Sequence, residues 1–336
     1  MKNTELIIST ELEVEDKYDR ADTEPDVEIR NLIFGQAQHG QRLDRALVEL
    51  VPEFSRSYLQ QLIDLDGVTL GGTVVRKSSI RVKAGDAGSI ELRATPQSQA
   101  FKPETMELEV VYEDAHLMVI NKPAGLVVHP APGNWSGTLL NGLLAYDAQA
   151  QNLPRAGIVH RLDKDTSGLM VVARTRAVMD ELVRLIAARE VSRQYVALAH
   201  RPWVGVNARE ITAPIGRDPR NRLRMAVVDL NKNSGKLART DIELLDSCDR
   251  GCLVLCSLHT GRTHQIRVHM SSIGHPLVAD VLYGGTVDAG MLRQALHACR
   301  LAFVHPITLK PMLFQAALPK DLDQATSLWG LRYNKS

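Results

Sequence analysis

A polar segment broken by two prolines divides this chain into a short part and a long part. Residues 94–104 read Ala-Thr-Pro-Gln-Ser-Gln-Ala-Phe-Lys-Pro-Glu, a composition expected of a linker between two folding units. The chain has 336 residues, which is enough for two or three domains. We therefore predict a small domain over 31–93, a linker over 94–104 and a larger domain over 105–336.

The net charge of +1 hides an uneven distribution of charged residues along the chain. Residues 1–30 hold ten acidic and four basic side chains, and we predict that this acidic stretch is a disordered tail. The remaining 306 residues carry 36 basic and 29 acidic side chains, a net charge of +7. Such a surplus suits a surface that faces phosphate groups, without proving one.

The pattern of apolar residues over 31–93 changes from helical to strand-like. Apolar residues repeat at helical spacing from Leu43 to Leu50, and a second helix is expected after Ser55, which is suited to cap its N-terminus. The pattern then alternates, which predicts a short hairpin over 68–75 and a further strand over 89–92. The small domain is therefore expected to combine two short helices with a small sheet.

The larger domain begins near Thr105 and mixes strand-like and helical patterns. Strands are expected at 108–112, 117–120, 169–173 and 191–198, and helices at 138–146 and 176–190. The run Leu169-Met-Val-Val-Ala173 is apolar throughout, which indicates a buried strand. Three of the four cysteines, at 248, 252 and 256, fall in an apolar run, where we expect them reduced in a core rather than bound to metal.

The loop that precedes the strand at 169–173 has the most informative chemistry. It places the carboxylate of Asp163 beside Arg161 and Lys164, whose positive charges would keep Asp163 ionised at neutral pH. The small residues Thr166-Ser167-Gly168 suit a turn that brings the backbone close to a ligand. An aspartate in a charged surface turn is more often structural, so these residues alone leave its role open.

Several motifs together resemble those of the RluA-type pseudouridine synthases. The sequence His-Arg-Leu-Asp at 160–163, followed by Thr-Ser-Gly-Leu at 166–169, resembles the family's catalytic motif. Asn-Lys-Pro-Ala-Gly at 121–125 and Thr-Gly-Arg-Thr-His-Gln-Ile-Arg-Val-His at 260–269 resemble its first and third motifs, in the same order. The resemblance covers residues 40 to about 330, and within the family it is closest to the D-type members.

The resemblance implies an α+β fold in two parts. Residues 40–93 resemble a small S4 RNA-binding domain, whose expected RNA contacts are Arg42, Arg56, Ser57 and Lys77. A pseudouridine synthase catalytic domain would follow, built on a mixed, largely antiparallel sheet with flanking helices. Within it, a basic loop would lie along a phosphate backbone through Arg220, Arg222 and Arg224. Ala279-Asp280 stands where the family usually has Gly-Asp, a difference that we expect to concern only a backbone turn.

The resemblance also implies a reaction, the isomerisation of several uridines to pseudouridine in one stem-loop of large-subunit (23S) ribosomal RNA, with no cofactor or metal. Asp163 would attack C1′ or remove the 2′ proton, and the sequence does not choose between these routes. Arg267 would pair with Asp163, while Tyr195 would pack on the uracil and assist the loss of its C5 proton. The base would be flipped out, with Arg161 filling the vacated space and Lys164 contacting phosphate or only water.

Two functions of other classes stay open. The first is a catalytically idle S4-type RNA-binding factor for ribosome assembly. The second is a metal hydrolase that uses His259, His264 and His269, but histidines five residues apart do not converge on one ion from a helix or a strand. A kinase is excluded because the glycine-rich loop and the Asp-Phe-Gly motif are missing.

The sequence also bears on location and partners. It contains no apolar run of about 18 residues, and its N-terminus lacks the basic and apolar regions of a signal peptide. We therefore expect a cytoplasmic protein that does not contact a membrane. Its expected partner is large-subunit ribosomal RNA in pre-ribosomal particles, and its expected state is a monomer.

Overall fold

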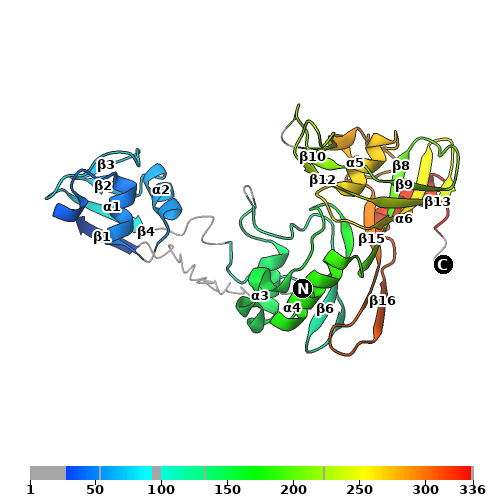
Figure 1. Cartoon of the computed structure of the whole chain (residues 1–336), viewed down its shortest axis with the longest axis horizontal. Helices are drawn as coiled ribbons and strands as arrows, with labels where there is room; N and C mark the ends of the chain where they lie inside the picture. The colour runs from blue at the N-terminus through cyan, green and yellow to red at the C-terminus, as the bar shows by residue number, and fades with distance from the viewer. Residues whose placement is uncertain (1–27, 53, 93–99, 132–133, 222–223, 334–336) are drawn as a thin grey trace, which may run out of the picture. The chain divides into compact units, whose positions relative to one another are not determined.

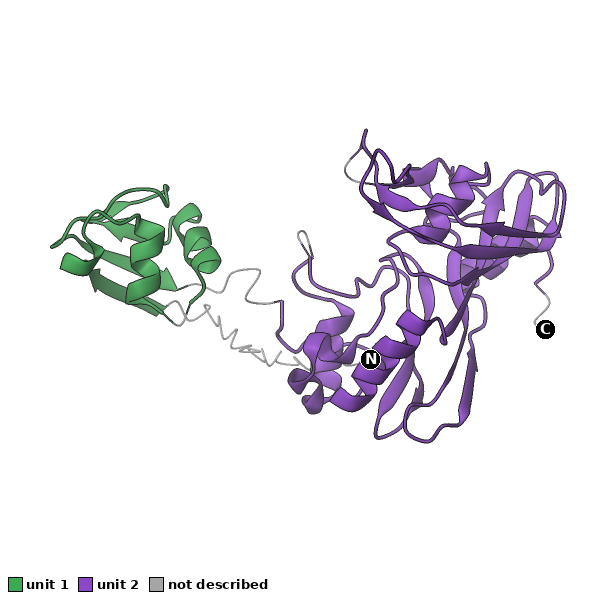
Figure 2. Ribbon diagram, viewed as in Figure 1, with its two compact units in different colours: residues 1–95 green, residues 96–336 purple. Residues whose placement is uncertain are grey.

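The structure is a computed structural model that describes residues 28–52, 54–92, 100–131, 134–221 and 224–333 (Figure 1). Its contacts divide the chain into two compact units, Met1–Thr95 and Pro96–Ser336 (Figure 2). Each unit has a sheet and a hydrophobic core of its own. The predicted tail up to residue 27 and the predicted linker over 94–99 lie outside the described residues.

The first unit packs two helices against a four-stranded antiparallel sheet with the strand order β1-β4-β2-β3. The elements are β1 Glu28–Ile33, η1 Gln36–Gln38, α1 Leu43–Leu50, α2 Arg56–Asp64, β2 Val68–Leu70, β3 Thr73–Val74 and β4 Ala87–Leu92. Ser55 Oγ accepts a hydrogen bond from the Tyr58 amide and so caps α2, as its position predicts. Both predicted helices, the hairpin and the strand over 89–92 are confirmed.

The structure differs from the predicted segments at two places. Strand β1 already begins at Glu28, because Glu28 to Arg30 pair with β4, so the last three residues predicted as tail belong to the sheet. Residues 100–104, predicted as linker, are held by the second unit. There the Asn141 side-chain amide donates to the carbonyls of Ala100 and Lys102 at 3.3 and 2.8 Å. These hydrogen bonds leave no hydrophobic pattern in the sequence, so periodicity did not indicate them.

The second unit is built on a nine-stranded sheet with the order β5-β6-β7-β15-β8-β14-β13-β9, in which β16 also pairs with β15. Only the β7–β15 pair is parallel among the pairs in the described residues. The bounds are β5 Val110–Glu113, β6 Leu117–Lys122, β7 Ser167–Ala173, β8 Ser192–His200, β9 Ala208–Ile211, β13 Thr240–Ser247, β14 Gly251–Leu258, β15 Leu296–Val304 and β16 Pro311–Gln315. The predicted mixed, largely antiparallel sheet is confirmed.

Helices cover both faces of this sheet (Figure 1). Alternate residues of β6, β7 and β8 pack with α3 Leu139–Tyr146 and α5 Gln265–Ser272 on one face. The other face packs with α4 Arg176–Ala188 and α6 Lys320–Leu328. A smaller sheet, β11-β10-β12, and three short 3-10 helices complete the unit: β10 Ile215–Arg217, β11 Met225–Val227, β12 Gly235–Lys236, η2 Ala148–Asn152, η3 Pro154–Gly157 and η4 Val281–Tyr283.

Most elements predicted for the larger domain are present with shifted ends. The helix predicted to reach residue 190 ends at Ala188, because Arg189 adopts a left-handed conformation with φ 66°. Every residue of β7 is buried, as its apolar run predicts. Cys252 and Cys256 are buried free thiols, whereas Cys248 is only half-buried. None of the helices among the described residues combines the length and the apolar character needed to cross a bilayer.

Candidate active site

Asp163 lies in the loop that enters the buried strand β7. Its main-chain carbonyl accepts a hydrogen bond from the Thr166 amide at 3.1 Å, which closes a tight turn before Ser167 begins the strand. Its carboxylate retains 17% exposure, so it is sheltered but reachable from solvent. The prediction that this carboxylate sits where a loop joins a sheet is confirmed.

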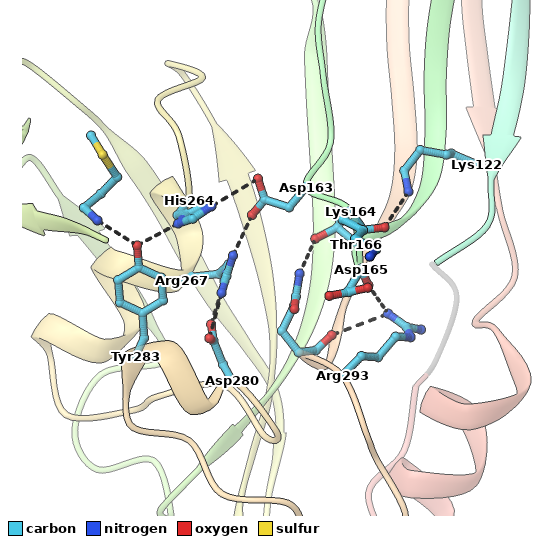
Figure 3. A network of polar contacts seen from close by, with 12 residues as sticks. Lys122, Asp163, Lys164, Asp165, Thr166, His264, Arg267, Asp280, Tyr283 and Arg293 are labelled. Atoms are coloured by element: carbon cyan, nitrogen blue, oxygen red, sulfur yellow. Dashed lines mark hydrogen bonds and ion pairs between the residues drawn. The ribbon is translucent and has the colours of Figure 1, made fainter. Parts of the chain in front are cut away.

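The main chain of this loop is fixed from two other segments (Figure 3). The Lys122 ammonium is buried and donates to the Lys164 carbonyl at 3.0 Å, and the Gly125 amide donates to the same oxygen at 2.9 Å. Arg293 Nη1 donates to the Asp165 carbonyl at 2.8 Å. These donors come from two different segments and hold the carbonyls of the two residues that follow Asp163. The loop that carries the carboxylate is therefore held firmly in place.

Gly168 allows two strands to pack closely. It lies inside β7 with φ 116°, and a Cβ there would be 2.3 Å from the Ala298 carbonyl oxygen. Only glycine allows β15 to run this close beside β7. The tight turn lies three residues earlier than predicted, from Asp163 to Thr166.

Arg267 on α5 is the charge partner of Asp163 (Figure 3). Its Nη1 donates to Asp163 Oδ2 at 3.1 Å, while Nε and Nη2 donate to the two oxygens of the buried Asp280 at 2.7 and 2.9 Å. Burial alone would lower the pKa of Arg267, but the hydrogen bonds and charges of Asp280 and Asp163 raise it instead. Arg267 is therefore a permanent positive charge, anchored independently of Asp163.

Tyr283 and His264 approach the same centre from η4 and from the start of α5. The Arg267 guanidinium carbon lies 4.9 Å from the centre of the Tyr283 ring, within the range of a cation–π contact. The Tyr283 hydroxyl is 2.7 Å from His264 Nδ1 and accepts from the Met225 amide at 3.0 Å. His264 Nε2 lies 3.9 Å from Asp163 Oδ1, and burial lowers the pKa of this histidine.

Neither of the two neighbours predicted to hold Asp163 ionised forms an ion pair with it among the described residues. Both Arg161 and Lys164 are exposed, whereas the Asp163 carboxylate contacts Arg267 on α5. Arg161 lines the cleft over Asp163, whereas Lys164 does not. Opposite charge at Asp163 is therefore supplied by the distant Arg267.

Tyr195 on β8 lines the same cleft as Asp163. Only 5% of the residue is exposed, and its hydroxyl has no hydrogen-bond partner among the described residues. Burial raises the pKa of Tyr195 to about 12. At neutral pH only about one molecule in 10⁵ would carry the phenolate, so the side chain presents a neutral ring to a ligand.

The cleft has a volume of about 370 Å³, within the range of small-ligand sites. Its walls come from the Asp163 loop, the C-terminal end of α4, strand β8 and the loop 258–264. Gln265 shapes the last of these, since its Oε1 accepts from Thr260 Oγ1 and from the Arg262 amide at 2.7 and 3.0 Å.

The three histidines that suggested a metal site have separate partners. His259 Nε2 lies 2.6 Å from Asp241, and His264 contacts Tyr283. His269 is fully buried between Thr240 and the Ala213 carbonyl. Within the described residues, no group of three or more histidine, cysteine or acidic side chains is arranged to hold a metal.

In the first unit, two of the expected RNA contacts surround a buried carboxylate that the sequence did not reveal. Arg42 donates to Asp44 at 3.0 Å and Arg56 at 2.8 Å, and both side chains remain about half exposed. Burial alone would raise the pKa of Asp44, but these hydrogen bonds lower it well below its usual range. Ser57 is exposed beside Ser55, and Lys77 is exposed without a partner among the described residues.

The basic loop of the second unit joins β10 to β11. Arg224 pairs with Asp218 at 2.6 Å and is 40% exposed, and Arg220 is exposed. Arg222 lies outside the residues that the structure describes. The loop ends at Met225, whose amide donates to Tyr283 and so connects the loop to the centre around Arg267.

Sequence reasoning missed Asp280, Tyr283 and His264 as members of this centre. His264 and Asp280 lie in segments that the sequence analysis discussed, and Tyr283 follows three residues after Asp280, but the sequence carries no sign of which of these side chains meet in space. Asp280 was assigned to a backbone turn only. Its neighbour Ala279 does adopt φ 59°, so the turn is real, and Asp280 additionally anchors Arg267.

Comparison with known proteins follows the same division into two units. A family model described as RNA pseudouridylate synthase matches residues 116–272, and a model of the S4 domain matches residues 41–87. Proteins named ribosomal large subunit pseudouridine synthase D are similar. The one from Neisseria meningitidis serogroup B is 46% identical, over 84% of this chain and 77% of its own length, and the one from Pseudomonas aeruginosa is 46% identical, over 84% and 90%.

A solved structure supports the fold of the second unit. The human RNA pseudouridylate synthase domain containing 1 superposes with a TM-score of 0.52 and is 27% identical, over 67% of this chain and 90% of that one. The resemblance stated from the sequence motifs is thereby confirmed, as is the α+β fold class with an S4-like first part.

Proposed function

The chain belongs to the RNA pseudouridylate synthase family, and from this membership we propose that it converts several uridines in one stem-loop of large-subunit (23S) ribosomal RNA to pseudouridine. Its activity as an RNA pseudouridine synthase, and ribosomal RNA as the target, agree with the names of relatives that are 41 to 46% identical. The observation that carries the proposal is the Asp163–Arg267 ion pair inside a cleft of nucleotide size.

The reaction requires the N-glycosidic bond to break and the same uracil to be rejoined through C5. One ionised carboxylate at the sugar can start this sequence, by attack on C1′ or by removal of the 2′ proton. Arg267 occupies one oxygen of Asp163 and leaves Oδ1 facing His264 across 3.9 Å. In either route this contact holds the carboxylate in one orientation while the uracil turns.

Tyr195 acts in this proposal by packing on the uracil. A phenol whose pKa is raised to about 12 is a weak base near neutral pH, so proton removal from C5 depends little on its ionisation. Its apolar ring, buried beside the cleft, offers a stacking surface for the extruded base.

RNA binding is assigned to exposed basic side chains in both units. Arg161 would enter the space that the flipped base vacates, and Lys164 would meet the backbone nearby. Arg42, Arg56, Ser57 and Lys77 would contact RNA from the first unit, and Arg220, Arg222 and Arg224 from the second. We keep the expectations of a cytoplasmic monomer and of pre-ribosomal particles as substrate as further parts of the proposal.

A map of pseudouridine in ribosomal RNA tests the proposal directly. Cells without this gene should lack pseudouridine at a cluster of positions in one stem-loop, and the wild-type gene should restore them. Asp163→Asn should not restore them, whereas Asp180→Asn, which removes an exposed carboxylate on α4, should. A catalytically idle assembly factor predicts instead that Asp163→Asn restores the full map, and that result would overturn the enzymatic role.

A further inference from the structure

Arg193 lies on the wall of the active-site cleft, and the roles described above do not use it. It stands on β8 two residues before Tyr195, so the two side chains leave the strand on the same side. Only 6% of Arg193 is exposed. A guanidinium so deeply buried normally needs an anionic partner, because burial of an unpaired charge is unfavourable.

No such partner exists within the described part of the protein. The side chain of Arg193 makes no hydrogen bond or ion pair there, and its Nε is buried without any acceptor. The neighbouring arginines differ in this respect. Arg267 is held by Asp280 and Arg293 by Asp321, each through two hydrogen bonds. Arg193 therefore carries unused donors into the cleft.

The surroundings of Arg193 add positive charge and leave room for it. Five arginines line the cleft but only one carboxylate does, Asp163, which is already paired with Arg267. Gly261 in the facing loop has no side chain, and a Cβ there would lie 3.1 Å from Arg193 Nη1. The glycine thus allows the guanidinium to lie beside the loop. The charge surplus favours an anionic occupant over a neutral one.

We propose that Arg193 binds a backbone phosphate of the target uridine once the nucleotide has been flipped into the cleft. This inference rests on the proposed function. Phosphate is the anionic group that an RNA substrate brings, and a guanidinium matches it with two parallel hydrogen bonds. The cleft then holds one nucleotide at two points on the same strand, the base at Tyr195 and the phosphate at Arg193.

The test uses the full-length protein and a synthetic stem-loop that carries one modified uridine identified by the pseudouridine map. Arg193→Gln should lower kcat/KM roughly 10- to 100-fold, the range for one charge-assisted contact. Arg193→Lys should recover part of this loss. The control Arg184→Gln removes an exposed arginine that pairs with Glu181 on α4, and it should change kcat/KM less than twofold.

A second arm identifies the group that Arg193 binds. Substrates carry a single neutral methylphosphonate at the linkage on the 5′ or the 3′ side of the target uridine. At one of these linkages, the methylphosphonate should lower the wild-type kcat/KM by the same factor as the Arg193→Gln substitution does on the ordinary substrate. The same methylphosphonate should not lower the kcat/KM of Arg193→Gln any further. Multiplicative losses at both linkages would refute the phosphate contact, as would full activity of Arg193→Gln on the ordinary substrate.

Thermal melting separates binding from a structural role. Without RNA, Arg193→Gln should melt no lower than the wild type, because an unpaired buried charge does not stabilise the free protein. A clearly lower melting temperature would assign Arg193 to the fold and overturn the inference. If wild-type protein forms no pseudouridine in the ordinary stem-loop, the proposed function fails instead, before Arg193 is tested.

Discussion

The buried pair of Arg267 and Asp280 offers a sharp test of how the Asp163 carboxylate is held. The change is Asp280→Asn, which keeps the shape of the side chain and removes its charge. Asp280 has 1% exposure and accepts hydrogen bonds of 2.7 and 2.9 Å from Arg267, whose own side chain has 8% exposure. The substitution retains one acceptor oxygen but places an amide NH₂ against the guanidinium.

The expected magnitude follows from this geometry. Complete loss of a partner from a buried ion pair costs about 3 to 5 kcal/mol, so the loss of one of two hydrogen bonds with the charge should cost roughly 2 to 3 kcal/mol. For a domain of this size each kcal/mol lowers the melting temperature by about 2 to 4 °C, which predicts a drop of roughly 4 to 12 °C. Arg267 would also lose its fixed position, and kcat should fall roughly 10- to 100-fold.

Calorimetry and the rate of tritium release from C5 of labelled RNA measure the two effects. Asp180→Asn is the matched control. Arg176 Nε contacts both oxygens of Asp180 at 3.0 Å, but the two side chains are 64% and 60% exposed, so its removal should cost less than about 1 kcal/mol. If Asp280→Asn melts like this control and keeps wild-type kcat, the anchoring of Arg267 by Asp280 is refuted.

Three further substitutions test other parts of the site. Ala279→Gly should stabilise the protein by up to about 1 kcal/mol in urea unfolding, since Ala279 adopts φ 59° where glycine is unstrained, and a loss of stability would contradict this. Tyr195→Phe should keep most of the rate of C5-tritium release while Tyr195→Ala loses it, because the pKa of Tyr195 is raised to about 12 and the ring acts by packing; equal losses would show that the hydroxyl is essential. Burial lowers the pKa of His160 from 6.5 to about 3. Below pH 6.5 the unfolded chain therefore binds a proton at this histidine that the folded chain does not, and the free energy of unfolding should fall by roughly 2 kcal/mol at pH 5. Urea titrations from pH 7 to pH 5 should show a smaller decline for His160→Asn, and an unchanged decline would assign the pH dependence to other groups.

The sequence indicated the side chains that face the cleft better than the buried contacts that hold them in place. The apolar run of β7 and the charged loop before it located Asp163, because both signals are local in the chain. Resemblance supplied Arg267, which lies 104 residues away from Asp163. No periodicity marks the Asp280 carboxylate as the anchor of Arg267, since that contact depends on where η4 packs against α5. Asp44 escaped notice for the same reason, since Arg42 just before α1 and Arg56 at the start of α2 meet it only in the folded unit.

Polar contacts also explain where predicted boundaries moved. Residues 100–104 have the composition of a linker, but the side chain of Asn141 binds their carbonyls and fixes them to the second unit. Likewise Glu28 to Arg30 belong to an acidic segment by composition and to a sheet by their pairing with β4. Composition reports how much apolar surface a segment can bury. These residues are instead held through their own backbone groups, by the Asn141 side chain in one case and by strand pairing in the other.

In the proposed reaction, the phosphate backbone of the RNA repels the Asp163 carboxylate. The cleft carries a surplus of positive charge, from one arginine that is paired with carboxylates and from others that are not. Arg267 neutralises Asp163 directly and is itself neutralised by Asp280, so this group of three adds one negative charge in total. Arg161 and Arg193 have no acidic partner among the described residues and leave the walls positive. Phosphate can therefore bind the unpaired arginines without competing with Asp163 for Arg267.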